Sequence, residues 1–370
     1  MEKYLIITPK INLIVSTPFS SRLNFLIVWL LILFFFGPVQ KVFSQHSNSN
    51  KFIYIANWNV ENLFDTIDDT TKNDDEFLPS SKKKWTEEKF LKKIDNLSQV
   101  IHFMNDGKGP DIIGLEEVEN MSVMKFIVYK FTNRDYIIVH RDSPDPRGID
   151  VGLIYDRNIF DILHVNKIPV LLPNNEPTRD ILHVTLKYKH GNDSLHIFVN
   201  HWPSRRTGKE TSEVKRNTAA QILKEKVDSV LQIDTKNKII ILGDFNDEPI
   251  DNSILDVLKA DTSNCSDLLQ PADNKLYNLA YHDYKLKLGT YLYKNNWNLL
   301  DQIIISGSLL NNNGISYFCD SFEIIKPDFM KVDKESDVSG PIPTYIGNKY
   351  IGGYSDHFPV GALFKYLGDK

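Results

Sequence analysis

The stretch Lys238-Ile-Ile-Ile-Leu-Gly-Asp-Phe-Asn246 joins a short apolar run to two polar side chains. An apolar run rich in β-branched residues predicts a buried strand over 238–242. Asp244 and Asn246 are two residues apart, so their side chains face the same way. Such a pair can orient a water molecule with the carboxylate and hold a phosphate oxygen with the carboxamide. Gly-Asp also marks ordinary turns, so this stretch predicts catalysis only together with other polar clusters.

Five further polar clusters stand beside apolar runs that predict strands. Three follow their runs and two precede them: Asn59 and Glu61 after 51–58, Glu117 after 111–115, Asn200 and His201 after 195–199, Asp301 before 302–305, and Asp356 and His357 before 358–364. In a mixed sheet, antiparallel strands bring strand starts and strand ends to the same edge. We therefore expect all six clusters to converge.

The remaining periodicities predict an α/β sandwich. We expect strands over 136–140, 151–155 and 181–186, the last forming a hairpin with 195–199, helices over 85–104, 211–231 and 253–258, and a surface loop over 66–84. Residues 308–350 are rich in Pro and Gly and predict a long, loop-rich excursion. Many strands with a few helices, partly linked by hairpins, indicate layered mixed sheets.

Each polar residue also has a purely structural interpretation. Asp301 at a strand start can cap a turn, and His201, which precedes Trp202, can be a packed core imidazole. Glu116 and Glu117 can be solvated, and Asp356 and His357 can form a local hydrogen-bonded pair. The occurrence of all these groups in one order makes a coincidence improbable.

The N-terminus differs from the rest of the chain. The run over 25–36 holds twelve apolar residues without a charge, which is short for a bilayer span and typical of a signal peptide. Val42-Phe43-Ser44 suits cleavage. We therefore expect a signal peptide over 1–44, a flexible start over 45–50 and one domain over 51–366, exported to the periplasm, cell surface or medium. An uncleaved anchor is the alternative.

Composition indicates a globular protein with an acidic body. The 370 residues are 42% hydrophobic and 25% charged, with a net charge of −5. Loss of 1–44 removes four basic residues and one acidic residue, which takes the charge to −8. Such a chain does not bind nucleic acid by its overall field. The two cysteines, Cys265 and Cys319, can form a disulfide after export or remain buried thiols.

The converging groups are carboxylates, carboxamides and two histidines. Oxygen ligands of this kind suit Mg²⁺, Mn²⁺ or Ca²⁺ better than Zn²⁺. The sequence has neither an HExxH motif nor paired cysteines for zinc, and it lacks a Walker loop and a nucleophile elbow. The chemistry predicted is therefore attack of a metal-activated water on phosphorus.

Six segments together resemble the endonuclease/exonuclease/phosphatase superfamily, which has the DNase I-like fold. They are Asn57–Phe64, Gly114–Val118, Asn200–Ser204, Gly243–Asn246, Leu300–Asp301 and Ser355–His357. The resemblance covers roughly 51–366. It implies a four-layer sandwich of two packed mixed β-sheets flanked by helices.

The resemblance also implies roles for individual residues. Asn59, Glu117 and Asp356 would hold the metal, with Asn59 also near the phosphate. Asp244 would orient or deprotonate the water, and Asn246 would hold a phosphate oxygen. His357, steadied by Asp301, and His201 would stabilise the transition state. Glu116 stands where many relatives have Gln, and its charge can alter metal affinity.

Arg147 and Arg205 lie beside these motifs and are expected to bind substrate phosphates. Arg206 is as well explained by a surface ion pair. We expect a monomeric, divalent-metal-dependent phosphodiesterase and interpret it as a nuclease acting on DNA or RNA. A phospholipid or phosphoinositide hydrolase is the enzymatic alternative, since fold does not fix substrate. A non-catalytic surface binding protein is a weaker alternative, because a binder needs neither both histidines nor the Asp244 and Asn246 pair.

Overall fold

The computed structural model describes residues 51–268, 270–333 and 339–368. Residues Asn50–Lys370 make up one compact unit. The predicted signal segment and flexible start, over 1–50, lie outside the described residues. Within the described ranges, helices long and apolar enough to span a bilayer do not occur.

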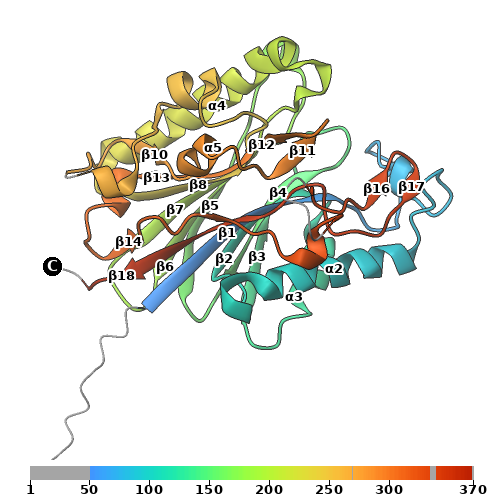
Figure 1. Cartoon of the computed structure of the whole chain (residues 1–370), viewed down its shortest axis with the longest axis horizontal. Coiled ribbons are helices and arrows are strands. Elements are labelled where there is room, and N and C mark those ends of the chain that lie inside the picture. Colours follow the sequence, from blue (N-terminus) through green and yellow to red (C-terminus); the bar gives the residue numbers. More distant parts are fainter. Residues whose placement is uncertain (1–50, 269, 334–338, 369–370) are drawn as a thin grey trace, which may run out of the picture. The chain divides into compact units, whose positions relative to one another are not determined.

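Two mixed sheets of seven strands form the centre of the fold (Figure 1). The first contains β1 (Lys51–Leu63), β2 (Ile112–Val118), β3 (Tyr136–His140), β4 (Asp150–Asp156), β14 (Ile315–Tyr317), β15 (Glu323–Ile324) and β18 (Val360–Tyr366). Its order is β14-β18-β1-β2-β4-β3, and β15 also pairs with β18.

The second sheet contains β5 (Phe160–Ile168), β6 (Ile181–Tyr188), β7 (Ser194–His201), β8 (Lys238–Asp244), β9 (Ala260–Asp261), β10 (Leu276–Asn278) and β13 (Asp301–Ser306). Its order is β5-β6-β7-β8-β13-β10-β9. Two separate hairpins pair β11 (Tyr291–Tyr293) with β12 (Asn296–Asn298) and β16 (Tyr345–Ile346) with β17 (Lys349–Tyr350).

Helices cover the outer faces of both sheets and complete four layers (Figure 1). They are α2 (Glu87–Gly107), α3 (Met121–Val128), α4 (Lys209–Ile233) and the short α5 (Tyr281–Lys285). One hydrophobic cluster joins α2 and α3 to the first sheet, a second fills the space between the sheets, and a third joins α4 to the second sheet. The four-layer sandwich predicted from the sequence is confirmed.

Side-chain alternation along the strands decides which groups reach the space between the sheets. In β8, Ile239 and Ile241 pack toward α4, whereas Ile240 and Leu242 belong to the central cluster. Successive side chains of a strand point to opposite faces. Asp244 therefore continues the inner row of Ile240 and Leu242, beyond the end of the central core.

The observed elements agree with most of the predicted ones. The prediction has no counterpart for β5, α3 and α5, or for the short strands β9, β10, β11 and β12. The segment over 253–258 is a single π-helical turn, Ser253–Val257, and the excursion over 308–350 adds β14 and β15 to the first sheet. Cys265 and Cys319 are joined in a disulfide, with their Cα atoms 5.6 Å apart.

Candidate active site

Strand register places three predicted catalytic side chains in one row across the second sheet. His201 of β7 pairs with Asp244 of β8 in the parallel ladder, and Asp301 of β13 pairs with Asp244 in the antiparallel ladder. All three continue the inner rows of their strands, whose apolar members lie between the sheets. The end of the central hydrophobic core is thus closed by a row of titratable groups.

Gly243 allows β7 and β8 to approach closely at this row. A Cβ atom on Gly243 would lie 2.2 Å from the backbone oxygen of Asn200. Any larger residue would therefore push apart the strand ends that carry His201 and Asp244. The glycine of the Gly-Asp-Phe-Asn stretch is thus explained by packing rather than by chemistry.

An irregularity between β1 and β2 positions the first-sheet groups. The parallel pairing shifts register between Asn59 and Leu63, and Glu61, Asn62 and Glu117 all have positive φ, at 54°, 49° and 61°. Positive φ is costly for residues other than glycine and concentrates at functional sites. The backbone N–H of Asn62 donates to Oε2 of Glu117 at 2.9 Å, which holds that carboxylate at the edge of the sheet.

Asp244 is held by two donors. Its Oδ2 accepts from Asn59 Nδ2 at 3.0 Å, and its Oδ1 accepts from the Asn246 backbone N–H at 2.9 Å. Burial raises the pKa of Asp244 to about 6, an effect that nearby His357 opposes and Asp301 reinforces. Asn246 has a φ of 51°, and its Nδ2 donates to the carbonyl of Trp202 at 3.1 Å. Asp244, predicted to orient the attacking water, and Asn246, predicted to hold a phosphate oxygen, therefore lie on one turn that these hydrogen bonds hold in place.

His357 and Asp301 form a buried pair. Nδ1 of His357 lies 2.7 Å from Oδ2 of Asp301, and their exposed fractions are 5% and 0%. Burial by itself would lower the pKa of His357, but the charge and hydrogen bond of Asp301 outweigh it and raise this pKa well above its ordinary value. Because Nδ1 is bonded to Asp301, Nε2 is the nitrogen left to meet a substrate.

His201 has the opposite electrostatic environment. Its Nε2 lies 3.6 Å from Asp244 Oδ2 and 3.9 Å from Glu117 Oε1. Burial, together with the charges of Arg179 and Arg147, lowers the pKa of His201 well below its usual range. The pKa values of the two histidines are therefore shifted in opposite directions. The shifts favour a neutral imidazole at His201 and a charged one at His357.

The predicted metal ligands lie in an environment that suits a divalent cation. Asp356 is partly buried. Its pKa is raised to about 7 by burial and by the carboxylates of Glu61 and Glu117, while His357 and, less strongly, Lys93 oppose this shift. Excess negative charge carried by oxygen ligands fits Mg²⁺, Mn²⁺ or Ca²⁺. Asn59, Glu117 and Asp356 would hold such an ion. These assignments stay predictions.

Glu116 of β2 pairs with Asn59 of β1 in the parallel ladder. It is fully buried, and Asn57 Nδ2 donates to its Oε2 at 3.1 Å. Burial raises the pKa of Glu116 well above its usual value, and the charges of Asp301 and Asp244 add to this effect. A protonated, neutral Glu116 has the charge of the glutamine expected at this position from the resemblance.

The Endonuclease/Exonuclease/phosphatase family profile matches residues 54–365. The chain belongs to the endonuclease/exonuclease/phosphatase family. A search of curated protein sequences found no match.

Solved structures of the endonuclease/exonuclease/phosphatase family share this fold. A family protein from Bacteroides thetaiotaomicron aligns at TM-score 0.53 and 16% identity, over 86% of this chain and 98% of its own. TDP2 from D. rerio, complexed with single-strand DNA product, aligns at TM-score 0.53 and 14% identity, over 85% and 99%. A mannosyl-6-phosphatase from B. thetaiotaomicron aligns at TM-score 0.51 and 17% identity, over 84% and 99%. The predicted family, fold and enzyme class are confirmed.

The two arginines predicted to bind substrate have different surroundings in this family member. Arg205 donates to the carbonyl of Asn246 at 2.5 Å and to the carboxylates of Asp247 at 3.1 Å and Asp251 at 2.6 Å. Its guanidinium therefore supports the turn that carries Asn246. The side chain of Arg147 is 46% exposed and reaches Asp145 at 3.3 Å. Substrate binding by either residue stays a prediction, and Arg147 is the more accessible of the two.

A cleft of about 610 Å³ extends from Asp356 between the hairpin β11–β12 and the segment leading to β16. Its walls are largely apolar and aromatic, formed by Tyr291, Leu292, Pro341, Pro343, Tyr345 and Ile346. The Tyr291 ring lies 4.8 Å from the His357 ring. A substrate can therefore place a flat or apolar group in the cleft while its phosphate reaches the catalytic row.

Two buried cations near the site were not predicted. Lys93 of α2 is 1% exposed, and its Nζ donates to Thr344 Oγ1 and lies 3.8 Å from Glu61. The sequence could have indicated that Lys93 is buried, because this residue falls on the apolar face of the helix, three residues after Phe90 and four before Leu97.

Arg179, two residues before β6, is the second buried basic residue. It donates to the carbonyl of Trp202 at 2.7 Å and to Asp145 at 3.0 Å. The sequence could have indicated Arg179 as a site residue, because it is a polar residue beside a predicted strand, as are the residues of the six predicted clusters.

Proposed function

We propose that this family member is an exported, Mg²⁺-dependent phosphodiesterase that hydrolyses nucleic acid. The observation that carries the proposal is the row His201, Asp244 and Asp301, completed by His357. These four side chains lie beside the carboxylates of Glu117 and Asp356 at one edge of the sandwich. This arrangement combines a base, a hydrogen-bonded imidazole and a hard-cation site, which are the parts required for water attack on phosphorus.

Each residue has a role that follows from its contacts. A bound divalent ion would neutralise the phosphate and polarise its oxygen. Asp244, fixed by Asn59 and Asn246, accepts the proton of the attacking water. His357, oriented by Asp301, donates from Nε2 to a phosphoryl or leaving oxygen.

His201 and Asn246 complete the donor set. Neutral His201 lies beside Asp244 and can donate to a second phosphate oxygen. Asn246 uses one amide hydrogen for Trp202 and keeps the other for the phosphate. The site thus offers several fixed donors to the charge that develops on phosphorus.

Nucleic acid is favoured by the cleft beside Asp356. Tyr291 and Tyr345 line it, and Tyr293 at the end of β11 is 54% exposed. Aromatic side chains stack on bases of any sequence, at about 1–3 kcal/mol per base. A neighbour of the same fold, TDP2 from D. rerio, was solved with single-strand DNA product.

A phosphate monoester of a sugar is the second candidate. It is favoured by the ion pairs of Arg147 with Asp145 and of Arg205 with Asp247 and Asp251, because these pairs leave fewer cations for a polyanion. A substrate with one phosphate needs fewer such contacts. Another neighbour of this fold is a mannosyl-6-phosphatase. A phospholipid remains an outcome of the test, since the cleft walls are apolar.

A substrate panel tests the proposal. Purified protein with Mg²⁺ is given single- and double-stranded DNA, RNA, a sugar 6-phosphate, sphingomyelin and a phosphoinositide. We expect the highest kcat/KM on a nucleic acid and loss of all activity in excess EDTA. Faster turnover of the sugar phosphate or a lipid overturns the nuclease assignment, and full activity of a metal-stripped sample in EDTA overturns the metal mechanism.

Export is supported by the apolar run over 25–36 and by the disulfide between Cys265 and Cys319, since disulfides persist in oxidising compartments. The mature protein is expected to begin near Gln45 and to act as a monomer. Mass spectrometry of the exported protein tests the first point. Retention of 25–36 would instead indicate a membrane anchor.

A further inference from the structure

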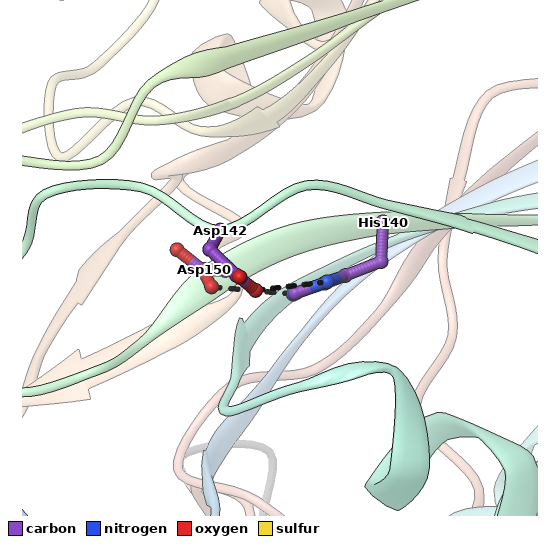
Figure 2. A group of neighbouring side chains, drawn as sticks. All are labelled: His140, Asp142 and Asp150. Carbon is purple, nitrogen blue, oxygen red and sulfur yellow. Dashed lines mark ion pairs between the residues drawn. The ribbon is translucent and has the colours of Figure 1, made fainter. Parts of the chain in front are cut away.

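His140 lies in a cluster with Asp142 and Asp150, where β3 ends and β4 begins (Figure 2). His140 Nε2 lies 3.2 Å from Asp150 Oδ2, and Nδ1 lies 3.6 Å from Asp142 Oδ1. One ligand atom from each residue lies within 4.8 Å of the other two. The catalytic roles described above use none of these three side chains.

The Nε2 atom of His140 meets Asp150 as an ion pair but without the geometry of a hydrogen bond. Its side chain is 4% exposed, and Nε2 makes no hydrogen bond although it faces the carboxylate of Asp150. Buried polar atoms without a hydrogen bond are rare and costly, and each calls for an explanation. A cation held by the imidazole nitrogen and the carboxylate would satisfy both groups.

The two carboxylates are arranged to accept such an ion. Asp150 uses Oδ1 to accept from the backbone N–H and hydroxyl of Ser143, which fixes the side chain and leaves Oδ2 facing His140. The Asp142 side chain is 85% exposed, so it can swing toward a bound ion with little loss of packing. Together the three residues offer one rigid oxygen, one rigid nitrogen and one adjustable oxygen.

The surroundings of the cluster are rich in negative charge. A pocket of about 270 Å³ adjoins it and is lined by five carboxylates, those of Asp69, Asp74, Glu119, Asp142 and Asp150. The two basic residues of the lining have other partners. Lys72 Nζ donates to the carbonyls of Ser143 and Asp145, and Arg147 pairs with Asp145. The buried Oδ1 of Asp74 also lacks a hydrogen bond.

We propose that His140, Asp142 and Asp150 bind one divalent transition-metal ion, with Zn²⁺ as the best match. An imidazole nitrogen combined with carboxylate oxygens suits zinc, whereas magnesium and calcium prefer oxygen alone. Three protein ligands leave a further position for water. The ion would clamp β3 to β4 and anchor the intervening segment, which carries Asp145 and Arg147 close to the catalytic row.

Zinc binding in the presence of magnesium tests this site. The whole protein is held in millimolar Mg²⁺, which fills the oxygen-rich catalytic site, and Zn²⁺ is titrated against a chromophoric chelator. We expect one Zn²⁺ per chain, and at least about tenfold weaker binding in His140→Gln and Asp142→Asn, since even outer-shell changes at metal sites cost 10–100-fold. Asp142→Asn alters an exposed side chain, so weaker Zn²⁺ binding by this variant cannot be attributed to misfolding.

Two further variants make the result specific. His282→Asn removes an exposed histidine that neighbours Asp283 and should leave Zn²⁺ binding unchanged. Glu117→Gln, which alters the catalytic site, should also retain the Zn²⁺. Absence of Zn²⁺ binding by the wild type in Mg²⁺, or equal affinity in wild type and Asp142→Asn, overturns the site and identifies the cluster as an ion-paired histidine. Loss of the Zn²⁺ in Glu117→Gln would likewise overturn it by assigning the ion to the catalytic centre.

Discussion

The side chains of His357 and Asp301 meet at 2.7 Å although 56 residues separate them in the chain. Asp301 starts β13 in the second sheet, and His357 precedes β18 in the first. The pair therefore connects the two sheets at the active-site edge. Its carboxylate is fully buried, so the negative charge of Asp301 acts on the imidazole without solvent screening.

Replacing Asp301 with Asn should lower kcat by roughly 10²- to 10⁴-fold, because the amide keeps the shape but removes the charge that orients and supports His357. Steady-state kinetics measure the effect, and thermal unfolding checks the fold. The double variant with His357→Ala should be no worse than His357→Ala alone, since the two residues act as a unit. Independent, multiplying losses would contradict the coupling.

Asp244→Asn should reduce kcat by at least about 10²-fold, the usual scale for removal of a general base. The amide oxygen can still accept from the Asn246 backbone N–H, but the amide NH2 then faces Asn59 Nδ2 and that hydrogen bond is lost, so the free energy of unfolding should fall by only about 1–3 kcal/mol. Single-turnover kinetics separate this chemical defect from weaker binding. A variant with near-normal kcat would remove Asp244 from the mechanism.

Adjacent glutamates should respond differently to the same substitution. Glu116→Gln should keep kcat/KM within about threefold of wild type, because burial raises the pKa of Glu116 well above its usual value and so favours the neutral carboxyl, whose shape the amide matches. Glu117→Gln should raise the Mg²⁺ concentration for half-maximal activity by at least about tenfold, through loss of a charged oxygen ligand. Metal titrations of activity measure both. Equal metal dependence in the two variants would remove Glu117 from the metal site.

Arg147 and Arg205 should differ in what their loss affects. Arg147→Ala should raise KM for nucleic acid more than it lowers kcat, the effect of losing a remote phosphate contact. Arg205→Ala should lower the free energy of unfolding by about 1–3 kcal/mol, because Asp247 and Asp251 lose charge-assisted hydrogen bonds. Kinetics and denaturant unfolding separate the two. An unchanged free energy of unfolding in Arg205→Ala would contradict a structural role for Arg205 and would instead favour direct substrate binding by this residue.

His183 should make stability depend on pH. Burial lowers its pKa to about 4, with smaller effects from His196 and His164. The unfolded chain therefore binds a proton between pH 6.5 and 4 that the folded chain excludes, so stability falls as pH falls through this window, by up to about 3 kcal/mol. His183→Gln should flatten this slope.

Denaturant unfolding from pH 7 to 4 measures the effect of His183. His102→Gln is a matched control, since His102 also stacks on a phenylalanine. An unchanged slope in His183→Gln would assign the pH dependence to other groups.

Much of the fold was predictable because the strands have strong apolar patterns. In β8, residues 238–242 are apolar enough to be buried on both faces, and the polar groups that follow mark the edge of the sheet. In contrast, β5 is buried only at its two ends, Phe160 and Ile168. An edge strand with an exposed middle lacks the alternation that identifies strands, so its sequence resembles that of a loop.

The candidate site was predictable as a set of residues but not in its geometry. Positive φ at Glu61, Asn62 and Glu117 arises from the irregular pairing of β1 with β2, which requires knowledge of the partner strand. The ion pairs of Arg205 with Asp247 and Asp251 likewise depend on tertiary contacts. Local sequence carries the identity of these groups, and long-range packing decides which of them remain available to substrate.

The row formed by His201, Asp244 and Asp301 makes enzymatic activity a sensor of correct folding. A slip of one residue between β8 and β13 would turn Asp301 to the opposite face of the sheet. Such a misfolded molecule could keep much of its secondary structure and still be inert. Specific activity therefore reports how many molecules have the native strand register, a quantity that circular dichroism of the same sample cannot resolve.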